Sequence, residues 1–288
     1  MGNSLIPLFF LGISALLNIG LDLFFILGLN MGISGAAWAT VVSQMVSALT
    51  ITLYCYRTQP VIHLEKRHLH PQRAIYRNII RLSLLTCVQQ SIMNFGILLI
   101  QGLVNSFGVT VMAAFAAAVK IDAFAYMPVQ DFGNAFSTFI AQNYGAGKKE
   151  RIHQGIRSAM VIALIFCLLV STTVFILAQP LMVVFIRPSE PEVIAAGVQY
   201  LRIEGAFYCA IGCLFLLYGF YRGIGRPGIS LILTVVSLGI RVLLAYTLAP
   251  TSLGLLAIWW AVPIGWILAD LTGLIYYGKL RKYPSSLL

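Results

Sequence analysis

The sequence predicts an all-α fold, a polytopic bundle of membrane-spanning helices. Hydrophobic residues make up 59% of the 288 residues and charged residues only 10%, whereas a soluble domain carries about a quarter charged residues. Several apolar runs reach the roughly 20 residues that a helix needs to cross the hydrocarbon. Strict alternation of apolar and polar residues, which is typical of a lipid-facing β-strand, is missing. We therefore expect helical spans.

Eight runs are long enough to span a membrane, which predicts eight transmembrane helices. In chain order they occupy 5–28, 34–56, 79–105, 109–141, 155–186, 193–220, 228–249 and 255–277. The first run is too long for a signal peptide and has no basic segment before it, so we predict a span there. In the fourth run, Pro128 and Gly133 predict a break in the helix.

Basic residues gather in every second connection between the runs. They follow the second, fourth, sixth and eighth runs, and Arg187 is the only basic residue in the other connections. This positive-inside pattern predicts an even number of spans with both termini in the cytoplasm. The net charge of +10 does not predict a nucleic-acid partner, because the charges alternate by membrane side and do not form one basic face.

Two stretches at opposite ends of the chain predict an internal repeat. GISGAAWA at 32–39 and GLLAIWWA at 254–261 both read Gly, five residues, then Trp-Ala, and each follows an apolar run that begins near a proline. The alternative is chance similarity between membrane helices of similar composition. If the repeat is real, the last two helices repeat the first two, and the repeating unit has six helices.

The repeat predicts an organisation in three parts. Residues 1–56 are the last two helices of an N-terminal lobe, 57–78 form a basic cytoplasmic loop between lobes, and 79–288 form a complete six-helix C-terminal lobe. Four helices are then missing before residue 1, and the intact protein has twelve spans. Two lobes related by an axis along the membrane normal are a known transporter plan.

A cation site is predicted in the first two helices. Asn18 and Asp22 are four residues apart and share a helix face, and Thr40 lies at a similar depth on the following helix, each about 9 Å from the outer end. Neither helix interior carries Lys or Arg. A bare carboxylate in lipid costs about 3 kcal/mol or more, so three oxygen donors here predict a place for a proton or Na⁺. The alternative is a structural carboxyl group.

A second charge cluster is predicted near the middle of the C-terminal lobe. It comprises Lys120, Asp122, Tyr126, Glu204 and Arg241. Asp122 and Tyr126 share a helix face, and Lys120 and Glu204 lie at similar depths and are a possible ion pair. Such residues face a bundle interior or a wet cavity. A fixed structural ion pair is the alternative.

Polar residues also recur along the third run. Gln90, Asn94 and Gln101 follow spacings of four and seven residues, which places them on one helix face. This stripe either lines a cavity or makes hydrogen bonds between helices.

The sequence contains no motif that predicts an enzyme active site or a cofactor site. GIGRPG at 223–228 matches GxGxxG but follows a membrane helix and not a strand, and GAGKK at 145–149 lacks P-loop spacing. No HExxH or G-x-S-x-G string occurs, and no spaced Cys/His set predicts a metal site. We expect no enzymatic activity, no cofactor and no metal other than Na⁺.

Three segments resemble the MATE family of multidrug and toxin extrusion transporters, particularly its DinF-like branch. They are residues 2–44, FGNAFSTFIAQNYGAGKKER at 132–151, and RGIGRP at 222–227 with the helices after it. The resemblance implies two six-helix lobes around a central cavity. It also implies that Asn18, Asp22 and Thr40 occupy three positions of a cation site in the first lobe, whose fourth ligand lies on a helix absent from this chain.

The resemblance implies an antiporter of the bacterial inner membrane that exports drugs or other amphipathic, often cationic, organic molecules in exchange for H⁺ or Na⁺. Three alternatives stay open. A lipid-linked saccharide flippase has a similar architecture but needs basic residues facing the cavity for pyrophosphate, and only Arg202 and Arg241 suit this. The second alternative, a membrane-embedded enzyme, is not supported by any catalytic motif in the sequence. An inactive truncated remnant is the third, and we expect these 288 residues not to transport by themselves.

Overall fold

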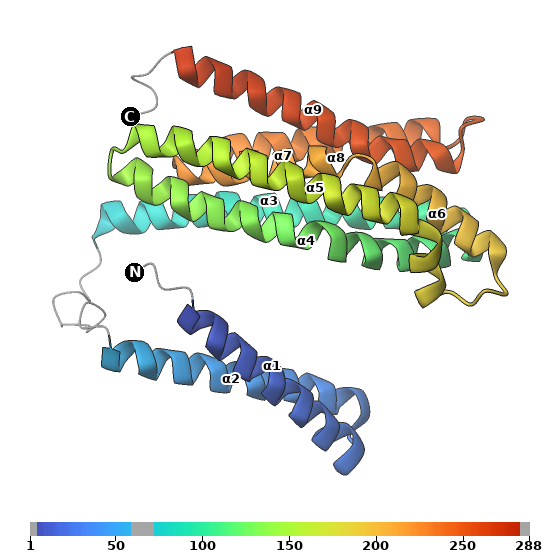
Figure 1. The fold of residues 1–288 in the computed structure, drawn as a ribbon, viewed down its shortest axis with the longest axis horizontal. Helices are drawn as coiled ribbons and strands as arrows, with labels where there is room; N and C mark the ends of the chain where they lie inside the picture. Colours follow the sequence, from blue (N-terminus) through green and yellow to red (C-terminus); the bar gives the residue numbers. More distant parts are fainter. Residues whose placement is uncertain (1–4, 59–71, 283–288) are drawn as a thin grey trace. The chain divides into compact units, whose positions relative to one another are not determined.

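The computed structural model describes residues 5–58 and 72–282. In this part of the chain every regular element is helical (Figure 1). In order, the elements are α1 (Leu5–Leu23), the π-helical turn η1 (Phe24–Gly28), α2 (Gly32–Thr58), α3 (Arg73–Asn105), α4 (Val109–Gly145), α5 (Lys149–Phe185), α6 (Pro191–Gly205), α7 (Tyr208–Gly223), α8 (Pro227–Leu248) and α9 (Leu255–Lys282).

The chain divides into two compact units, Met1–Ile75 and Tyr76–Leu288. The division falls inside the range predicted as the loop between lobes, 57–78, of which residues 59–71 lie outside the described part. Within the described residues, seven helices are long and apolar enough to cross a membrane, and the bent pair α6–α7 makes up to eight. The prediction of an all-helical membrane protein is therefore confirmed, and the predicted eight spans are reached when α6 and α7 are counted as one bent span.

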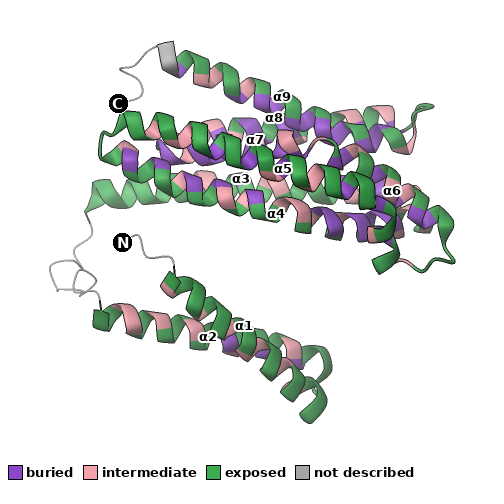
Figure 2. Cartoon of the chain, viewed as in Figure 1, coloured by how far each residue is buried: buried purple, intermediate pink, exposed green. Residues whose placement is uncertain are grey.

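The first unit contains a helical hairpin of α1, η1 and α2. Helix α2 packs closely against η1 at Gly35, where an added Cβ would lie 3.1 Å from the Phe25 Cβ. The Ser14 hydroxyl donates to the carbonyl of Ser43 at 3.2 Å, which joins the two helices. Most large side chains of both helices are exposed (Figure 2), so the hairpin presents apolar surface to lipid or to further protein.

The second unit is centred on α7. Buried side chains follow α7 along almost its whole length and line the inward parts of α4, α6 and α9 (Figure 2). The helix pair α4 and α7 approaches most closely at two glycines: a Cβ on Gly133 would lie 2.8 Å from the carbonyl oxygen of Phe215, and Gly219 faces the Gly133 carbonyl. Small residues permit such close approach where helices meet in a membrane.

The predicted break at Pro128 and Gly133 does not occur. Helix α4 continues through both residues from Val109 to Gly145. Proline is tolerated within membrane helices because neighbouring groups compensate for the lost backbone hydrogen bond. Gly133 serves the contact with α7 and does not end the helix.

A break that the sequence did not predict divides the sixth run. Helices α6 and α7 meet at an angle of 53°, and the turn is closed by the Phe207 amide, which donates to the Glu204 carbonyl at 2.9 Å. The hydroxyl of Ser171 on α5 donates to the Gly205 carbonyl. This side chain satisfies a backbone acceptor at the break, as a non-helical turn at membrane depth requires.

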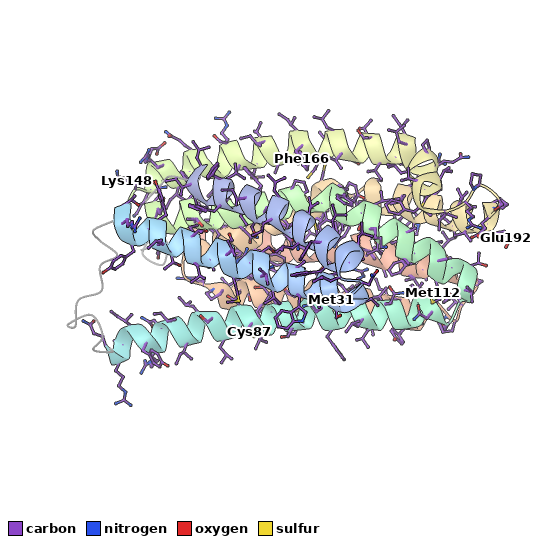
Figure 3. The ribbon with its side chains drawn as sticks, turned by 90° about the horizontal axis from the view of Figure 1, so that it is seen from below. Met31, Cys87, Met112, Lys148, Phe166 and Glu192 are labelled. Carbon is purple, nitrogen blue, oxygen red and sulfur yellow. The ribbon has the colours of Figure 1, made fainter. Side chains whose placement is uncertain are left out.

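Helix α5 extends along the second unit and separates two connections of different charge. Lys148, just before α5, and Glu192, in the first turn of α6, lie at opposite ends of the bundle (Figure 3). Lys148 belongs to one of the basic connections that the positive-inside pattern assigns to the cytoplasm.

Candidate functional site

Two buried carboxyl groups meet in the second unit. Asp122 on α4 is 5% exposed and Glu204 at the end of α6 is 1% exposed. The Tyr208 hydroxyl donates to Asp122 Oδ1 at 2.6 Å. Glu204 lies close to both Asp122 and Tyr200 in the wall of one cavity, and its Oε1 atom is buried without a hydrogen-bond partner. This arrangement leaves one carboxylate oxygen free to accept a proton or a ligand.

The break between α6 and α7 positions this cluster. Tyr200 and Glu204 are four residues apart on α6, so they share a face, and Tyr208 begins α7 directly after the turn. The bend lets side chains from both helices converge on Asp122 of α4. The sequence had pointed to the two acids but not to Tyr200 and Tyr208. The four-residue spacing of positions 200, 204 and 208 was the signal for these two tyrosines.

The cluster lines a cavity of about 120 Å³. Tyr126, Arg241 and Trp266 contribute polar and aromatic groups to its wall. The fully buried ring of Trp259 packs edge-on against the Tyr200 ring, with 4.9 Å between the ring centroids. It also stacks on the Phe115 ring, with a centroid separation of 5.6 Å. This aromatic packing fixes one side of the cavity.

Arg241 on α8 supplies the positive charge of the cavity. It is half-buried, and its Nε atom has no hydrogen-bond partner. Within the described ranges it forms no ion pair with either carboxyl group, yet it is close enough to act electrostatically on both. The cavity therefore combines two acids with one guanidinium that is not locked to them.

Lys120 lies apart from the cluster, which corrects the expected pair with Glu204. Its side chain is exposed. Lys120 and Asp122 are two residues apart, a rotation of about 200° around the helix axis. When Asp122 faces inward, Lys120 points away.

The polar stripe of α3 lies mainly on the outer face of the second unit, and its role as a cavity lining stays a prediction. Gln90 and Asn94 are exposed, and Gln101 donates to Asn105 on the same helix at 3.0 Å. The neighbouring Gln89 is the buried one, and its Nε2 donates to Thr234 Oγ1 of α8 at 3.0 Å. The inward face of α3 consists of Gln89, Gly96, Ile100 and Val104. Their spacing of seven, four and four residues was the sequence signal for Gln89.

The predicted cation ligands lie on the hairpin of the first unit. Asn18 and Asp22 are half-buried, and Asn18 Nδ2 and Asp22 Oδ1 are buried without hydrogen-bond partners. Thr40 is exposed, and its hydroxyl donates to the Ala36 carbonyl of its own helix at 3.0 Å. The helix changes to π geometry at Phe24, two residues after Asp22, and such π turns frequently occur at functional sites.

Metal ligands do not cluster in the described part of the chain. No group of three or more His, Cys, Asp and Glu residues there could hold a metal ion. At Asp22 the ligands would be oxygen atoms of Asn18, Asp22 and Thr40, the donor type that hard ions such as Na⁺ prefer.

The comparison with protein families decides the identity. The sequence model of the MatE family matches residues 86–247, more than half of the chain, and includes Asp122, Glu204 and Arg241. This chain belongs to the MatE family. The resemblance inferred from the sequence is thereby confirmed at the level of the family.

Relatives of this MatE chain are named as multidrug resistance proteins. It is 25% identical to the probable multidrug resistance protein NorM of Thermotoga maritima over 98% of this chain and 62% of that protein. It is 29% identical to the probable multidrug resistance protein YpnP of Bacillus subtilis over 82% of this chain and 52% of that protein. The chain thus spans less than two thirds of the length of these relatives.

Solved structures show the same arrangement of helices. An outward-facing multidrug resistance MATE transporter of the MOP superfamily matches with a TM-score of 0.87 and 26% identity, over 96% of this chain and 61% of that one. A MOP superfamily transporter from Pyrococcus furiosus, described as having a binding pocket of reversed polarity, matches equally well with a TM-score of 0.87. The MatE chain is therefore a multi-pass membrane protein of a multidrug and toxin extrusion transporter family.

Proposed function

We propose that this chain is part of a secondary antiporter that exports amphipathic, often cationic, organic molecules in exchange for H⁺ or Na⁺. Its setting would be the bacterial inner membrane with both termini in the cytoplasm, as the alternating basic connections favour. The names of the multidrug resistance relatives support the class of substrate.

The observation that carries the proposal is the state of Asp22. Its Oδ1 and the Nδ2 of Asn18 are buried without partners on a helix whose described part carries no basic side chain. A carboxylate in that setting is costly, and binding a proton or Na⁺ offsets the cost. We propose that Asn18 and Asp22, with Thr40 on the next helix, take up and release the coupling ion.

A closed site does not require the Thr40 hydroxyl to leave its present hydrogen-bond partner. The Thr40 hydroxyl oxygen has a second lone pair, so it can ligate an ion while its hydrogen stays on the Ala36 carbonyl. The site needs the Thr40 side chain to point toward Asn18 and Asp22. The two lobes would then rock between an ion-bound and an ion-free arrangement. The coupling ion favours one arrangement and the organic substrate favours the other.

The cavity of the second unit is the proposed contact for the organic substrate. Asp122 and Glu204 offer negative charge, and Tyr126, Phe115 and Trp266 offer aromatic faces, which attract cations as well. Arg241 offsets one of the two negative charges when no substrate is present, and a cationic substrate would compete with it for the acids.

The test is Asp22→Asn in the complete twelve-span protein that the repeat predicts. Efflux of ethidium from an efflux-deficient bacterium is expected to fall at least tenfold, because an amide cannot exchange a proton or neutralise Na⁺. Glu150→Gln, an exposed acid in the first turn of α5, is the matched control and is expected to leave efflux unchanged. Undiminished gradient-driven efflux in Asp22→Asn would remove the assigned role.

The flippase alternative gains little support. Arg241 faces the cavity, but Arg202 is exposed and lies over the Phe175 ring at 5.6 Å. A pyrophosphate needs several converging donors, whereas this cavity offers two carboxyl groups beside one guanidinium.

A further inference from the structure

A second pocket lies at one end of the same unit, far along the helices from the acidic cavity. It has a volume of about 570 Å³ and lies between the beginning of α3 and the turn from α7 to α8. Arg81 of α3 and Arg226 of the turn line it, and Asn78 adds a polar side chain. The two guanidinium groups are on different elements, and none of the described residues that line the pocket is acidic.

The backbone of the turn holds Arg226 at the pocket. Helix α7 ends at Gly223, and Gly225 in the turn after it has a φ of +74°, which is a left-handed conformation suited to glycine. The Arg226 amide then donates to the Tyr221 carbonyl at 2.8 Å, the six-to-one hydrogen bond of a Schellman motif. Pro227 starts α8 immediately afterwards. The turn therefore fixes the backbone position of Arg226 at the rim of the pocket.

The rest of the lining is apolar and lies deeper along both helices. Leu82 and Leu85 follow Arg81 on α3, and Ile229 and Ile232 follow Arg226 on α8. With a rise of about 1.5 Å per residue, Leu85 is about 6 Å and Ile232 about 9 Å further from the charged rim. Both helices run in the same direction from this end, so the pocket is basic at its mouth and apolar toward the membrane interior.

The position of the pocket along the membrane normal fits its polarity. Arg81 is in the third turn of α3, a helix of 33 residues, which is longer than the roughly 20 residues that span the hydrocarbon. Arg226 precedes the first residue of α8. Both arginines thus lie at the level where lipid headgroups meet the acyl chains, on the side that carries the basic connections.

We propose that this pocket binds an anionic phospholipid, with its phosphate between Arg81 and Arg226 and an acyl chain along Leu85 and Ile232. Arginine matches phosphate oxygen atoms through paired N–H donors. Basic pockets between membrane helices on the cytoplasmic side recognise anionic lipid headgroups. A free phosphate ion would satisfy the guanidinium groups alone, whereas only a lipid also covers the apolar wall.

The site would act on the second lobe from outside the transport pathway. It joins α3 to the α7–α8 turn, and α3 otherwise contacts α8 through the Gln89 to Thr234 hydrogen bond and the packing of Gly96 against Leu238. A bound lipid would therefore stabilise the association of α3 with the rest of the lobe.

The experiment uses the 288-residue chain, purified in a neutral detergent, with phosphatidylglycerol or phosphatidylcholine added at low mole fraction. Retained lipid is counted by native mass spectrometry. We expect phosphatidylglycerol to bind with one preferred site. The double variant R81Q/R226Q should weaken this binding about 30-fold, and R81Q alone about fivefold, the factors expected for basic side chains near an anionic membrane surface.

A matched control removes two charges from the same end of the unit. R151Q/R157Q alters two exposed arginines of α5 that do not line the pocket and is expected to bind phosphatidylglycerol within threefold of the unaltered chain. Thermal unfolding without lipid checks that each variant folds. If R226Q disturbs the turn, R81Q alone still tests the proposal, because it changes only an exposed side chain. The temperature of unfolding of the unaltered chain is expected to rise with phosphatidylglycerol.

Three results would overturn the proposal. Equal losses in the pocket and control variants would show a diffuse charge effect. Equal retention of phosphatidylcholine would show that the phosphate charge is not what is recognised. Stabilisation by inorganic phosphate as large as that by phosphatidylglycerol, lost in R81Q/R226Q, would show an ion site and exclude the lipid.

Discussion

Single hydrogen bonds decide how the buried acids are held. Asp122 accepts a hydrogen bond from the Tyr208 hydroxyl at 2.6 Å, whereas Oε1 of Glu204 and Oδ1 of Asp22 are buried without hydrogen-bond partners. A buried polar atom without a partner costs free energy, and such atoms in native proteins often mark functional sites. The three acids therefore differ: Asp122 is anchored, while Glu204 and Asp22 keep capacity for a ligand.

Tyr208→Phe tests this anchoring. The variant removes one hydroxyl and leaves Asp122 Oδ1 without its donor, so the free energy of unfolding is expected to fall by about 1–2 kcal/mol. Tyr246→Phe is the control, because its hydroxyl donates to the Leu99 carbonyl at 3.1 Å on an exposed surface and its loss is expected to cost less. Denaturation in mixed micelles measures both. Equal losses of unfolding free energy in Tyr208→Phe and Tyr246→Phe would contradict a special role of the buried hydrogen bond between Tyr208 and Asp122.

At the scale of elements, the contact between α4 and α7 organises the second lobe. Gly133 and Gly219 bring the two backbones together, which carries Asp122 on α4 toward Tyr208 on α7. The glycine in α4 that resembled a helix breaker is a packing residue, since only a hydrogen at this position fits against the Phe215 carbonyl. The bend between α6 and α7 completes the cluster by turning Glu204 inward.

Gly133→Ala is expected to destabilise the protein by about 1–3 kcal/mol, because the added Cβ would lie 2.8 Å from a backbone oxygen that cannot move by itself. Gly102→Ala in α3 is the matched control: nothing lies within 4 Å of its added Cβ, so the helix is expected to gain about 0.5–1 kcal/mol. Thermal unfolding of the two variants provides the measurement. A neutral Gly133→Ala would show that the helices separate easily.

At the scale of the whole molecule, the two ends of the chain follow one pattern. Each carries a hairpin whose second helix is preceded or begun by a glycine with positive φ, +57° at Gly32 and +51° at Gly254. These glycines open the two matching segments found in the sequence. The shared backbone conformation fits the predicted repeat, and positive φ also occurs at Gly108, Gly147 and Gly225 in other helix connections.

Gly32→Ala and Gly254→Ala are expected to lower the free energy of unfolding by similar amounts, about 1–2 kcal/mol each, the cost of a left-handed conformation for an L-residue. Neither added Cβ meets an atom within 4 Å, so the effect would come from the backbone alone. Gly239→Ala, in a helix with open space around it, serves as the control and is expected to be neutral or stabilising. Unequal effects at the two repeated glycines would argue against equivalent hairpins.

The sequence by itself determined the helical class, the eight spans and the family, because these depend on the length of apolar runs and on motifs that are local in the chain. It also identified Asp122 and Glu204, since charges within spans are rare enough to stand out. It did not predict the continuity of α4 through Pro128 or the bend after Glu204.

Only the tertiary structure decided which side chains meet. It turned Lys120 away from Glu204, brought Tyr208 to Asp122, and selected Gln89 over Gln90 as the buried residue of α3. The physical reason is that a contact between helices depends on the rotation of each helix about its axis and on the angle at its breaks. A shift of one residue rotates a side chain by about 100°, and small residues such as Gly133 and Gly219 on the partner helices fix that rotation.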